Sequence, residues 1–324
     1  MITAYILHDS GESEILHDAA ATADAWTAGV AAMWVDVAGE DRVALEMLGE
    51  RLGIERPAIE DCFEGRQRPR IDEYDDHIFL LMYDCAVSET TTVFSPKKAG
   101  VFYGPKRLVT VHPEPVRALD PIHRRCAANP TATFQRGLDF LLYMIIDGIV
   151  DDCVLAAEQY EDAMDALEER SLAGEIDGDI LERLSQLRRD LIAFRRYLSS
   201  LREVLRPFAQ GIYRHLSIDL EFQFRHVTDH VSLALEVIEG LREATHAIHD
   251  NYFAQLAERT NALMRTLTLF STFLLPLALI TGFYGMNIIL IPSIESPWTT
   301  VFVCALMVIT GVCMYTYFRR RKFL

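Results

Sequence analysis

The chain has 324 residues, and about half of them are apolar, which is enough to bury a substantial core. A formal net charge of -16 excludes a typical nucleic-acid-binding protein, because a phosphate backbone needs Lys and Arg to neutralise it, and it favours cations as ligands. The sequence has no Walker loop, no G-x-S-x-G and no H-E-x-x-H motif, so we expect no enzymatic activity, no resident cofactor and no nucleic-acid partner.

Residues 1–130 predict a cytosolic α/β domain. The N-terminal segment lacks the basic start and the apolar run of a signal peptide, so we expect it to lie in the cytosol. Runs rich in β-branched and aromatic residues predict strands at Ile2–Leu7, Ala32–Val37, Ile78–Tyr83, Gly100–Tyr103 and Leu108–His112. Helices are predicted at Asp41–Leu52 and Pro115–Ala128.

Long helices follow this domain. An apolar stripe from Phe134 onward predicts a helix that lasts until Gly174, and a second helix should run from Ile176 to Arg206, where Pro207 is expected to break it. We therefore assign residues 131–212 to a cytosolic helical hairpin and residues 213–265 to a long stalk helix that continues into a membrane. Acidic residues concentrate in the hairpin, and most of them are expected to form a solvated surface while a minority bind cations.

Two membrane spans are predicted near the C-terminus. Segments 266–287 and 298–318 are each apolar over roughly the 20 residues that cross a bilayer, and segment 288–297 is the external loop between them. The loop has no Lys or Arg, whereas basic residues precede the first span and fill the tail 319–324. The positive-inside rule then predicts a multi-pass protein of the plasma (inner) membrane with both termini in the cytoplasm. One hairpin has no interior that shelters polar groups from lipid, so a conducting protein of this type must be an oligomer.

The first predicted span ends with the sequence Tyr284-Gly285-Met286-Asn287. A Gly-Met-Asn triplet in this place resembles the signature of the CorA family of magnesium and cobalt transporters, within the wider superfamily of CorA-like metal ion transporters. Segments Gln67–Tyr74, Asp139–Asp152 and Leu275–Leu277 and the basic tail agree with this resemblance, which extends over nearly the whole chain.

The resemblance implies a funnel-shaped homopentamer in which the first span lines the pore, the second lies outside it, and the α/β domains form a cytosolic ring. It also implies a ring of Asn287 carboxamides at the outer mouth, next to Gly285 and Met286. Mg²⁺ gives up water reluctantly, so amide oxygens suit a hydrated ion. Gly285 would let the backbone turn at the mouth, and Asn287 is also compatible with an ordinary helix C-cap.

The activity that the resemblance implies is influx of a divalent cation. A doubly charged ion gains roughly 4 to 5 kcal/mol on crossing 100 mV, so the membrane potential suffices as the driving force. Mg²⁺ is the expected substrate, with Co²⁺, Ni²⁺ or Zn²⁺ left open by the sequence. Family members are thought to close when cytosolic Mg²⁺ occupies acidic sites between subunits, which makes Mg²⁺ both substrate and regulatory ligand.

Steps of three or four residues back from Asn287 predict a helical stripe that faces the pore axis. Its members are Gly282, Ala278, Leu275, Ser271, Thr268 or Leu267, Met264 and Asn261. The resemblance assigns Met264 and Leu267 to an apolar constriction, which would gate by dewetting, and Asn261 to its cytosolic side. Ordinary helix packing remains the alternative for each single residue. Ala278 stands where family members often have Thr, so one polar layer of the pore is expected to be missing.

Two other functions stay open at this point. His226 and His230 are spaced i, i+4 with Asp229 between them, a pattern that can bind Zn²⁺, so the alternative substrate is zinc in a transporter of the same architecture. Solvent-facing histidines on a long helix are the simpler interpretation, and His226 replaces an acidic regulatory residue of the family. The second alternative is a membrane-anchored sensor that conducts nothing, although an anchor needs neither the polar stripe nor Asn287.

Overall fold

The computed structural model describes residues 1–65, 67–85, 94–173, 178–213, 216–286 and 297–320. The chain forms two compact units, Met1–His249 and Asp250–Leu324, which are described in turn.

The first unit is built on a mixed sheet of seven strands in the order β2-β1-β3-β7-β6-β5-β4. The strands are β1 Ile2–Leu7, β2 Ser13–Leu16, β3 Ala32–Ala38, β4 Arg70–Glu73, β5 Ile78–Asp84, β6 Lys97–Tyr103 and β7 Arg107–His112. The central pair β3 and β7 is parallel, with Trp34 opposite Leu108, and the other pairs are antiparallel. All five predicted strands are present. The edge strands β2 and β4, of four residues each, were not predicted.

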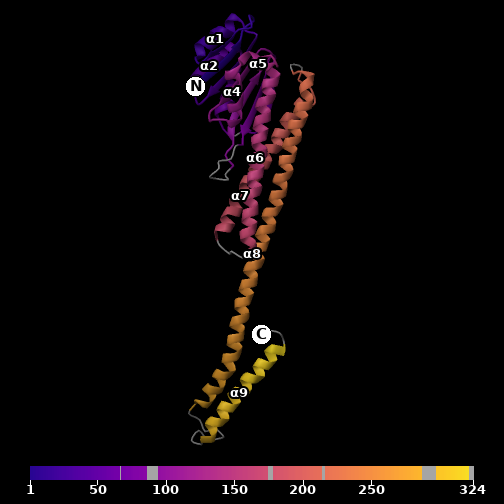
Figure 1. Ribbon diagram of the computed structural model, residues 1–324. Coiled ribbons are helices and arrows are strands. Elements are labelled where there is room, and N and C mark those ends of the chain that lie inside the picture. The colour runs from indigo at the N-terminus through magenta and orange to yellow at the C-terminus, as the bar shows by residue number, and fades with distance from the viewer. Residues whose placement is uncertain (66, 86–93, 174–177, 214–215, 287–296, 321–324) are drawn as a thin grey trace. The chain divides into compact units, whose positions relative to one another are not determined.

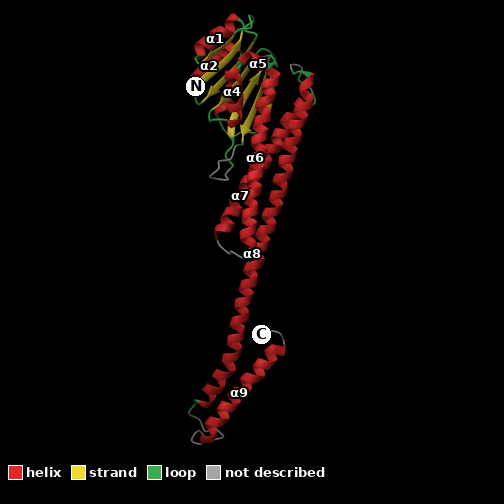
Figure 2. Ribbon diagram, in the orientation of Figure 1, coloured by secondary structure: helices red, strands yellow, loops and turns green. Residues whose placement is uncertain are grey.

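Helices cover both faces of this sheet (Figure 2). One face packs against α1 Ala19–Ala28, α2 Arg42–Leu52 and α3 Arg56–Phe63. The other packs against the short 3-10 helix Arg117–Leu119, α4 Asp120–Ala128, α5 Pro130–Phe134 and the long helices. Successive side chains of a strand point to opposite faces, so Tyr5 joins one core and its neighbour Ile6 joins the other.

Helix α2 shows how local sequence sets the ends of an element. The Asp41 carboxylate accepts a hydrogen bond from the Ala44 N–H at 3.2 Å, which caps the first turn. Gly53 follows the last residue with φ of 66°, a left-handed conformation that glycine adopts without steric cost. Between these caps, Leu45, Leu48 and Leu52 are buried, as the apolar spacing predicts.

Three long helices lie side by side in the first unit (Figure 1). They are α6 Leu138–Leu172, α7 Gly178–Ala209 and the part of α8 Glu221–Tyr284 that precedes Asp250. Three expected boundaries were wrong. Phe134 does not belong to the first long helix, because it ends α5, and α6 begins at Leu138 after Gly137 with φ of 92°. Pro207 does not break α7, because it lies in the last turn and the helix continues to Ala209. The third helix begins at Glu221 and not near His215, after Gly211 with φ of 64° and a short 3-10 turn at Ile218–Leu220.

The second unit contains the rest of α8 and α9 Pro297–Arg320. Helix α8 continues through Pro276, which lies inside it. The predicted external loop and the basic tail lie outside the described residues, apart from Pro297, Arg319 and Arg320.

Candidate functional site

The apolar parts of α8 and α9 are exposed. Each helix contains an 18-residue window long and apolar enough to cross a membrane, with mean hydropathies of 1.8 and 2.0, and no residue in either window is buried within the chain. A helix that is apolar on all sides needs an apolar environment on all sides. These two helices therefore are not the buried core of a soluble protein, and they require lipid or further protein around them.

One side of α8 in this unit faces α9. The Phe273 ring lies 5.8 Å from the Phe318 ring of α9, measured between centroids. Between Leu267 and Met286, the other partly buried residues of α8 recur every three or four positions on the same side. They are Leu269, Thr272, Pro276, Leu277, Ile280 and Tyr284.

The predicted pore stripe lies on the other side of α8. Asn261, Met264, Leu267, Thr268, Ser271, Leu275 and Ala278 are all exposed. The exposed fraction of their surface is large, at 61 % for Leu267 and 70 % for Leu275. With about 100° between successive residues, Ser271 and Leu275 each point roughly 160° away from Phe273. The residues predicted to share one face therefore do share it, and that face is turned away from α9.

Hydroxyl groups in this part of α8 bond to their own helix. The Thr268 hydroxyl donates to the Met264 carbonyl at 2.7 Å, and the Thr272 hydroxyl donates to the Thr268 carbonyl at 2.6 Å. Such bonds make a hydroxyl compatible with an apolar surrounding, because its proton is satisfied without water.

The signature segment lies at the C-terminal end of α8. The Gly285 N–H donates to the Thr281 carbonyl at 2.9 Å, and both Gly285 and Met286 are exposed. Any side chain at Gly285 would place its Cβ 3.1 Å from that same carbonyl oxygen, which is a tight contact. Asn287 lies outside the described residues, so the carboxamide ring stays a prediction.

The histidine pair lies in the first unit. The rings of His226 and His230 are 4.2 Å apart between centroids, and His230 Nδ1 lies 3.9 Å from the Asp151 carboxylate of α6. Asp229 is exposed. Within the described ranges, no group of three or more His, Cys, Asp or Glu side chains is arranged to hold a metal ion. A regulatory site at His226, Asp229 and His230 would thus need a ligand from outside the described residues, and it stays a prediction.

A pair of carboxyl groups that the sequence did not reveal joins β5 to α6. Asp84 is fully buried at the end of β5, where its carboxylate accepts the Arg117 N–H at 2.9 Å. Burial, together with the charge and the hydrogen bond of Asp84, raises the pKa of Asp152 to about 6. The sequence does not reveal this pair, because the partner of Asp152 lies in a strand far away in the sequence.

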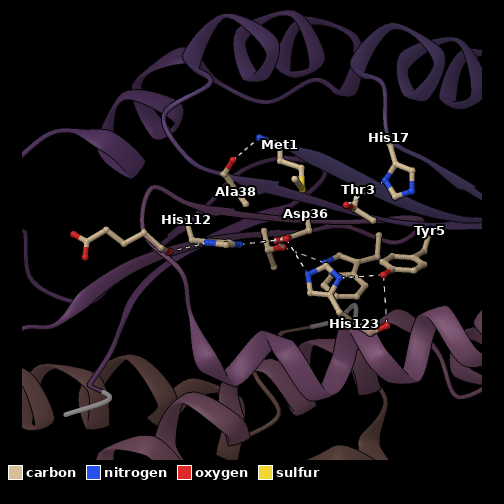
Figure 3. Close-up of polar contacts among 11 residues, drawn as sticks. Met1, Thr3, Tyr5, His17, Asp36, Ala38, His112 and His123 are labelled. Atoms are coloured by element: carbon tan, nitrogen blue, oxygen red, sulfur yellow. Dashed lines mark hydrogen bonds and ion pairs between the residues drawn. The ribbon is translucent and has the colours of Figure 1, made fainter. Parts of the chain in front are cut away.

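A second unpredicted network surrounds Asp36 of β3 (Figure 3). Its carboxylate lies 3.2 Å from His112 Nε2 and 2.9 Å from His123 Nε2, and it accepts the Thr110 hydroxyl proton. Burial alone would raise the pKa of Asp36, but the hydrogen bonds of His112 and His123 outweigh it and hold this pKa well below its usual range. Burial lowers the pKa of His112, yet the hydrogen bond and charge of Asp36 prevail and raise it. These groups hold α4 to the sheet.

Comparison with known proteins places these features in a family. The chain matches the CorA-like Mg²⁺ transporter protein family over residues 30–320. The chain belongs to this family. It is 28 % identical over 293 residues to the cobalt/magnesium transport protein CorA of Thermotoga maritima, a match that covers 90 % of this chain and 83 % of that protein.

Structural comparison agrees with the CorA fold. The structure of the CorA magnesium transporter from Methanocaldococcus jannaschii matches with a TM-score of 0.85 and 22 % identity over 100 % of this chain and 99 % of that chain.

The zinc transport protein ZntB of Yersinia pseudotuberculosis is also similar in sequence. It is 22 % identical over 274 residues, which covers 82 % of this chain and 80 % of that protein. The resemblance inferred from the Gly-Met-Asn segment is thus confirmed, together with the soluble domain and the two C-terminal candidate spans.

Proposed function

We propose that this protein is a divalent-cation channel that admits Mg²⁺, and also Co²⁺ or Ni²⁺, across a plasma membrane. The observation that carries the proposal is the exposed stripe on α8, opposite the side that meets α9. In a single hairpin this stripe would face lipid, where polar groups are unfavourable. Several copies arranged around an axis would cover it and enclose a pore.

The proposed assembly is a homopentamer with α8 inside and α9 outside, and with both termini in the cytoplasm. Met264 and Leu267 form the apolar constriction, which excludes water when it is narrow and admits hydrated ions when it widens. Asn287 and the exposed Gly285 and Met286 form the outer mouth, where carboxamide oxygens hold the hydrated ion. Cytosolic Mg²⁺ bound between subunits closes the channel. Membership of the CorA family and the similarity to the CorA protein of T. maritima support this assignment.

Zinc is the second candidate substrate. Two observations favour it: the paired rings of His226 and His230, and the similarity to a zinc transport protein. Imidazole nitrogen suits Zn²⁺ far better than Mg²⁺, which prefers oxygen ligands.

Ion uptake into proteoliposomes tests the proposal. Wild-type protein should admit Mg²⁺, detected with an enclosed Mg²⁺ dye, and Asn287→Ala should lower the uptake at least about tenfold, because it removes the groups that hold the hydrated ion. Val308→Ala is the matched control, since Val308 is an exposed residue of α9 outside the proposed pore. If the liposomes take up Zn²⁺ but not Mg²⁺, the transported ion is zinc. If they take up neither ion, the protein is better explained as a membrane-anchored sensor.

A further inference from the structure

A large cavity lies in the first unit. Its volume is about 800 Å³, within the range of small-molecule binding sites. Part of its wall comes from the residues that follow β3 and β7, namely Glu40, Pro113 and Glu114. Ligands of α/β sheets commonly bind outside the carboxyl ends of parallel strands, and β3 and β7 are the parallel pair of this sheet.

Helix α7 contributes a basic wall to this cavity. Arg189, Ala193 and Arg196 line the cavity at i, i+4 and i+7, so they share one face of the helix, and all three are exposed. The small side chain of Ala193 leaves room between the two arginines, whose Cα atoms are about 10 Å apart along the helix. Arg189 donates to the Gln186 amide oxygen at 2.6 Å, and neither arginine forms an ion pair with any residue that the structure describes.

The segment between α3 and β4 contributes a third exposed arginine, Arg68, which also has no ion pair among the described residues. Lys98 is engaged elsewhere, because its ammonium group donates to the carbonyls of Asp61, Glu64 and Gly65 at 2.7 to 2.9 Å. The acidic lining residues are Glu40 and Glu114, both exposed, and Asp190. Asp190 accepts hydrogen bonds from the Gln186 amide nitrogen at 2.9 and 3.1 Å, but burial outweighs them and raises the pKa of Asp190, which disfavours its charged form.

Aromatic rings complete the lining. Phe63 and Phe94 are each partly exposed at the cavity. In a chain with a net charge of -16, three unpaired guanidinium groups around one cavity indicate an anionic ligand, and guanidinium groups bind phosphate in bidentate geometry. The volume greatly exceeds that of a single phosphate. Arg42 lies over one face of Phe63, at 5.6 Å from the ring centroid, and Phe94 packs against Phe194, so a base could stack only on the remaining side of either ring.

We propose that this cavity binds a nucleoside triphosphate. Arg68, Arg189 and Arg196 hold the phosphate chain, and Phe63 or Phe94 stacks on the base. The bound nucleotide contacts both α7 and the segments around the sheet, so it stabilises their contact. The inference does not depend on which ion the protein carries.

Isothermal titration calorimetry on the full-length protein in detergent, with ATP in the presence of EDTA, tests the site. We expect measurable ATP binding, weakened at least about tenfold in the double variant Arg189→Ala/Arg196→Ala, since each substitution removes a charge-assisted contact to phosphate. The matched control is Arg188→Ala/Arg202→Ala, which removes two exposed arginines of the same helix outside the cavity. Equal thermal unfolding midpoints for the two double variants establish that both are folded.

Titration with inorganic triphosphate separates a nucleotide site from a general polyanion site. We expect inorganic triphosphate to bind several-fold more weakly than ATP. Phe63→Leu or Phe94→Leu should lower the affinity for ATP and leave the affinity for inorganic triphosphate unchanged. The proposal is overturned by no ATP binding up to about 1 mM, by equal weakening in both arginine double variants, or by triphosphate that binds as tightly as ATP.

Discussion

At the residue scale, two carboxyl groups of the first unit have pKa values shifted in opposite directions. The two imidazole rings beside Asp36 lower its pKa, whereas burial beside Asp84 raises the pKa of Asp152 to about 6. Each pKa shift is a difference between folded and unfolded states, so each makes stability depend on pH in its own direction.

Asp36→Asn should lower the stability of the protein most at mildly acidic pH. Because the pKa of Asp36 is lowered in the folded state, Asp36 stabilises the fold above about pH 4, and this stabilisation is lost as the pH falls. Because the pKa of His112 is raised, His112 stabilises the fold below about pH 6.5, and this stabilisation is lost as the pH rises. Breaking a buried pair costs about 3 to 5 kcal/mol, which corresponds to a fall of about 10 °C in the unfolding midpoint at pH 5.5.

Differential scanning fluorimetry of the full-length protein in detergent measures this midpoint from pH 4 to 8. Asp24→Asn on α1 is the control, because Asp24 is exposed and its carboxylate forms no ion pair with any described residue. A midpoint for Asp36→Asn that equals the control at pH 5.5 would contradict the assigned network.

Asp152→Asn should raise the unfolding midpoint, whereas Asp36→Asn lowers it. The pKa of Asp152 is raised to about 6, so the folded state loses stability as the pH rises from about 4 through 6 and Asp152 ionises beside Asp84. Asparagine imitates the neutral form, and the variant should unfold at a higher temperature than wild type at pH 7.5 but at the same temperature at pH 4. The same fluorimetric scan checks this, with the exposed Asp162→Asn of α6 as control; a variant less stable than wild type at pH 7.5 would disprove it.

At the element scale, α8 has two faces in the second unit that differ in chemistry. The side toward α9 is almost entirely apolar, and Thr272 is the hydroxyl residue on it. The opposite side interleaves Thr268 and Ser271 with large apolar residues, and the hydroxyls of Thr268 and Thr272 both bond to their own helix. A face of this mixed kind suits a water-filled constriction better than lipid.

Cysteine accessibility should reveal these faces. In a background with Cys304→Ala and Cys313→Ala, Ser271→Cys and Ala278→Cys should react with a charged methanethiosulfonate reagent, because they line the proposed aqueous path. Phe273→Cys and Ile280→Cys on the opposite face should react at least about tenfold more slowly, since a thiolate hardly forms away from water. Mass spectrometry of the labelled protein gives the rates, and equal rates on both faces would exclude the proposed pore lining.

The sequence was most informative about elements with a strong internal pattern. The strand Ile2–Leu7, the helix that ends at Leu52 and the apolar stripe on α6 were predicted because burial imposes a period on their residues. The edge strands β2 and β4 were missed because they are short and contain no buried residue, so burial imposes no alternation on them.

At the scale of the whole molecule, the sites differ in how far the sequence could predict them. The pore stripe lies on one helix, where residue spacing alone fixes which side chains share a face. The Asp36 network joins residues from β3, β7 and α4, and the Asp84 pair joins β5 to α6. Such contacts depend on strand order and helix packing, which no local pattern encodes.

Subunit mixing tests the proposed assembly. If five subunits surround one pore and each must supply Asn287, liposomes with equal amounts of wild type and Asn287→Ala should retain only about 3 % of wild-type uptake, because random assembly rarely yields an intact pentamer. The subunits must be co-expressed so that they mix during assembly. Mixing with Asp24→Asn should leave uptake unchanged, and half-maximal uptake in the Asn287→Ala mixture would mean that each chain conducts alone.

The hydrogen bond from the Thr268 hydroxyl to the Met264 carbonyl affects how the proposed pore would distinguish cations from anions. With its proton committed to the helix, the oxygen of Thr268 can present only lone pairs outward. In the proposed pentamer, a collar of such oxygens would accept hydrogen bonds from the waters around a cation, whereas the waters around chloride, which point their oxygens outward, would find no donor there. An uncharged residue of this kind would discriminate against anions without the deep electrostatic well in which a carboxylate collar would trap a doubly charged ion.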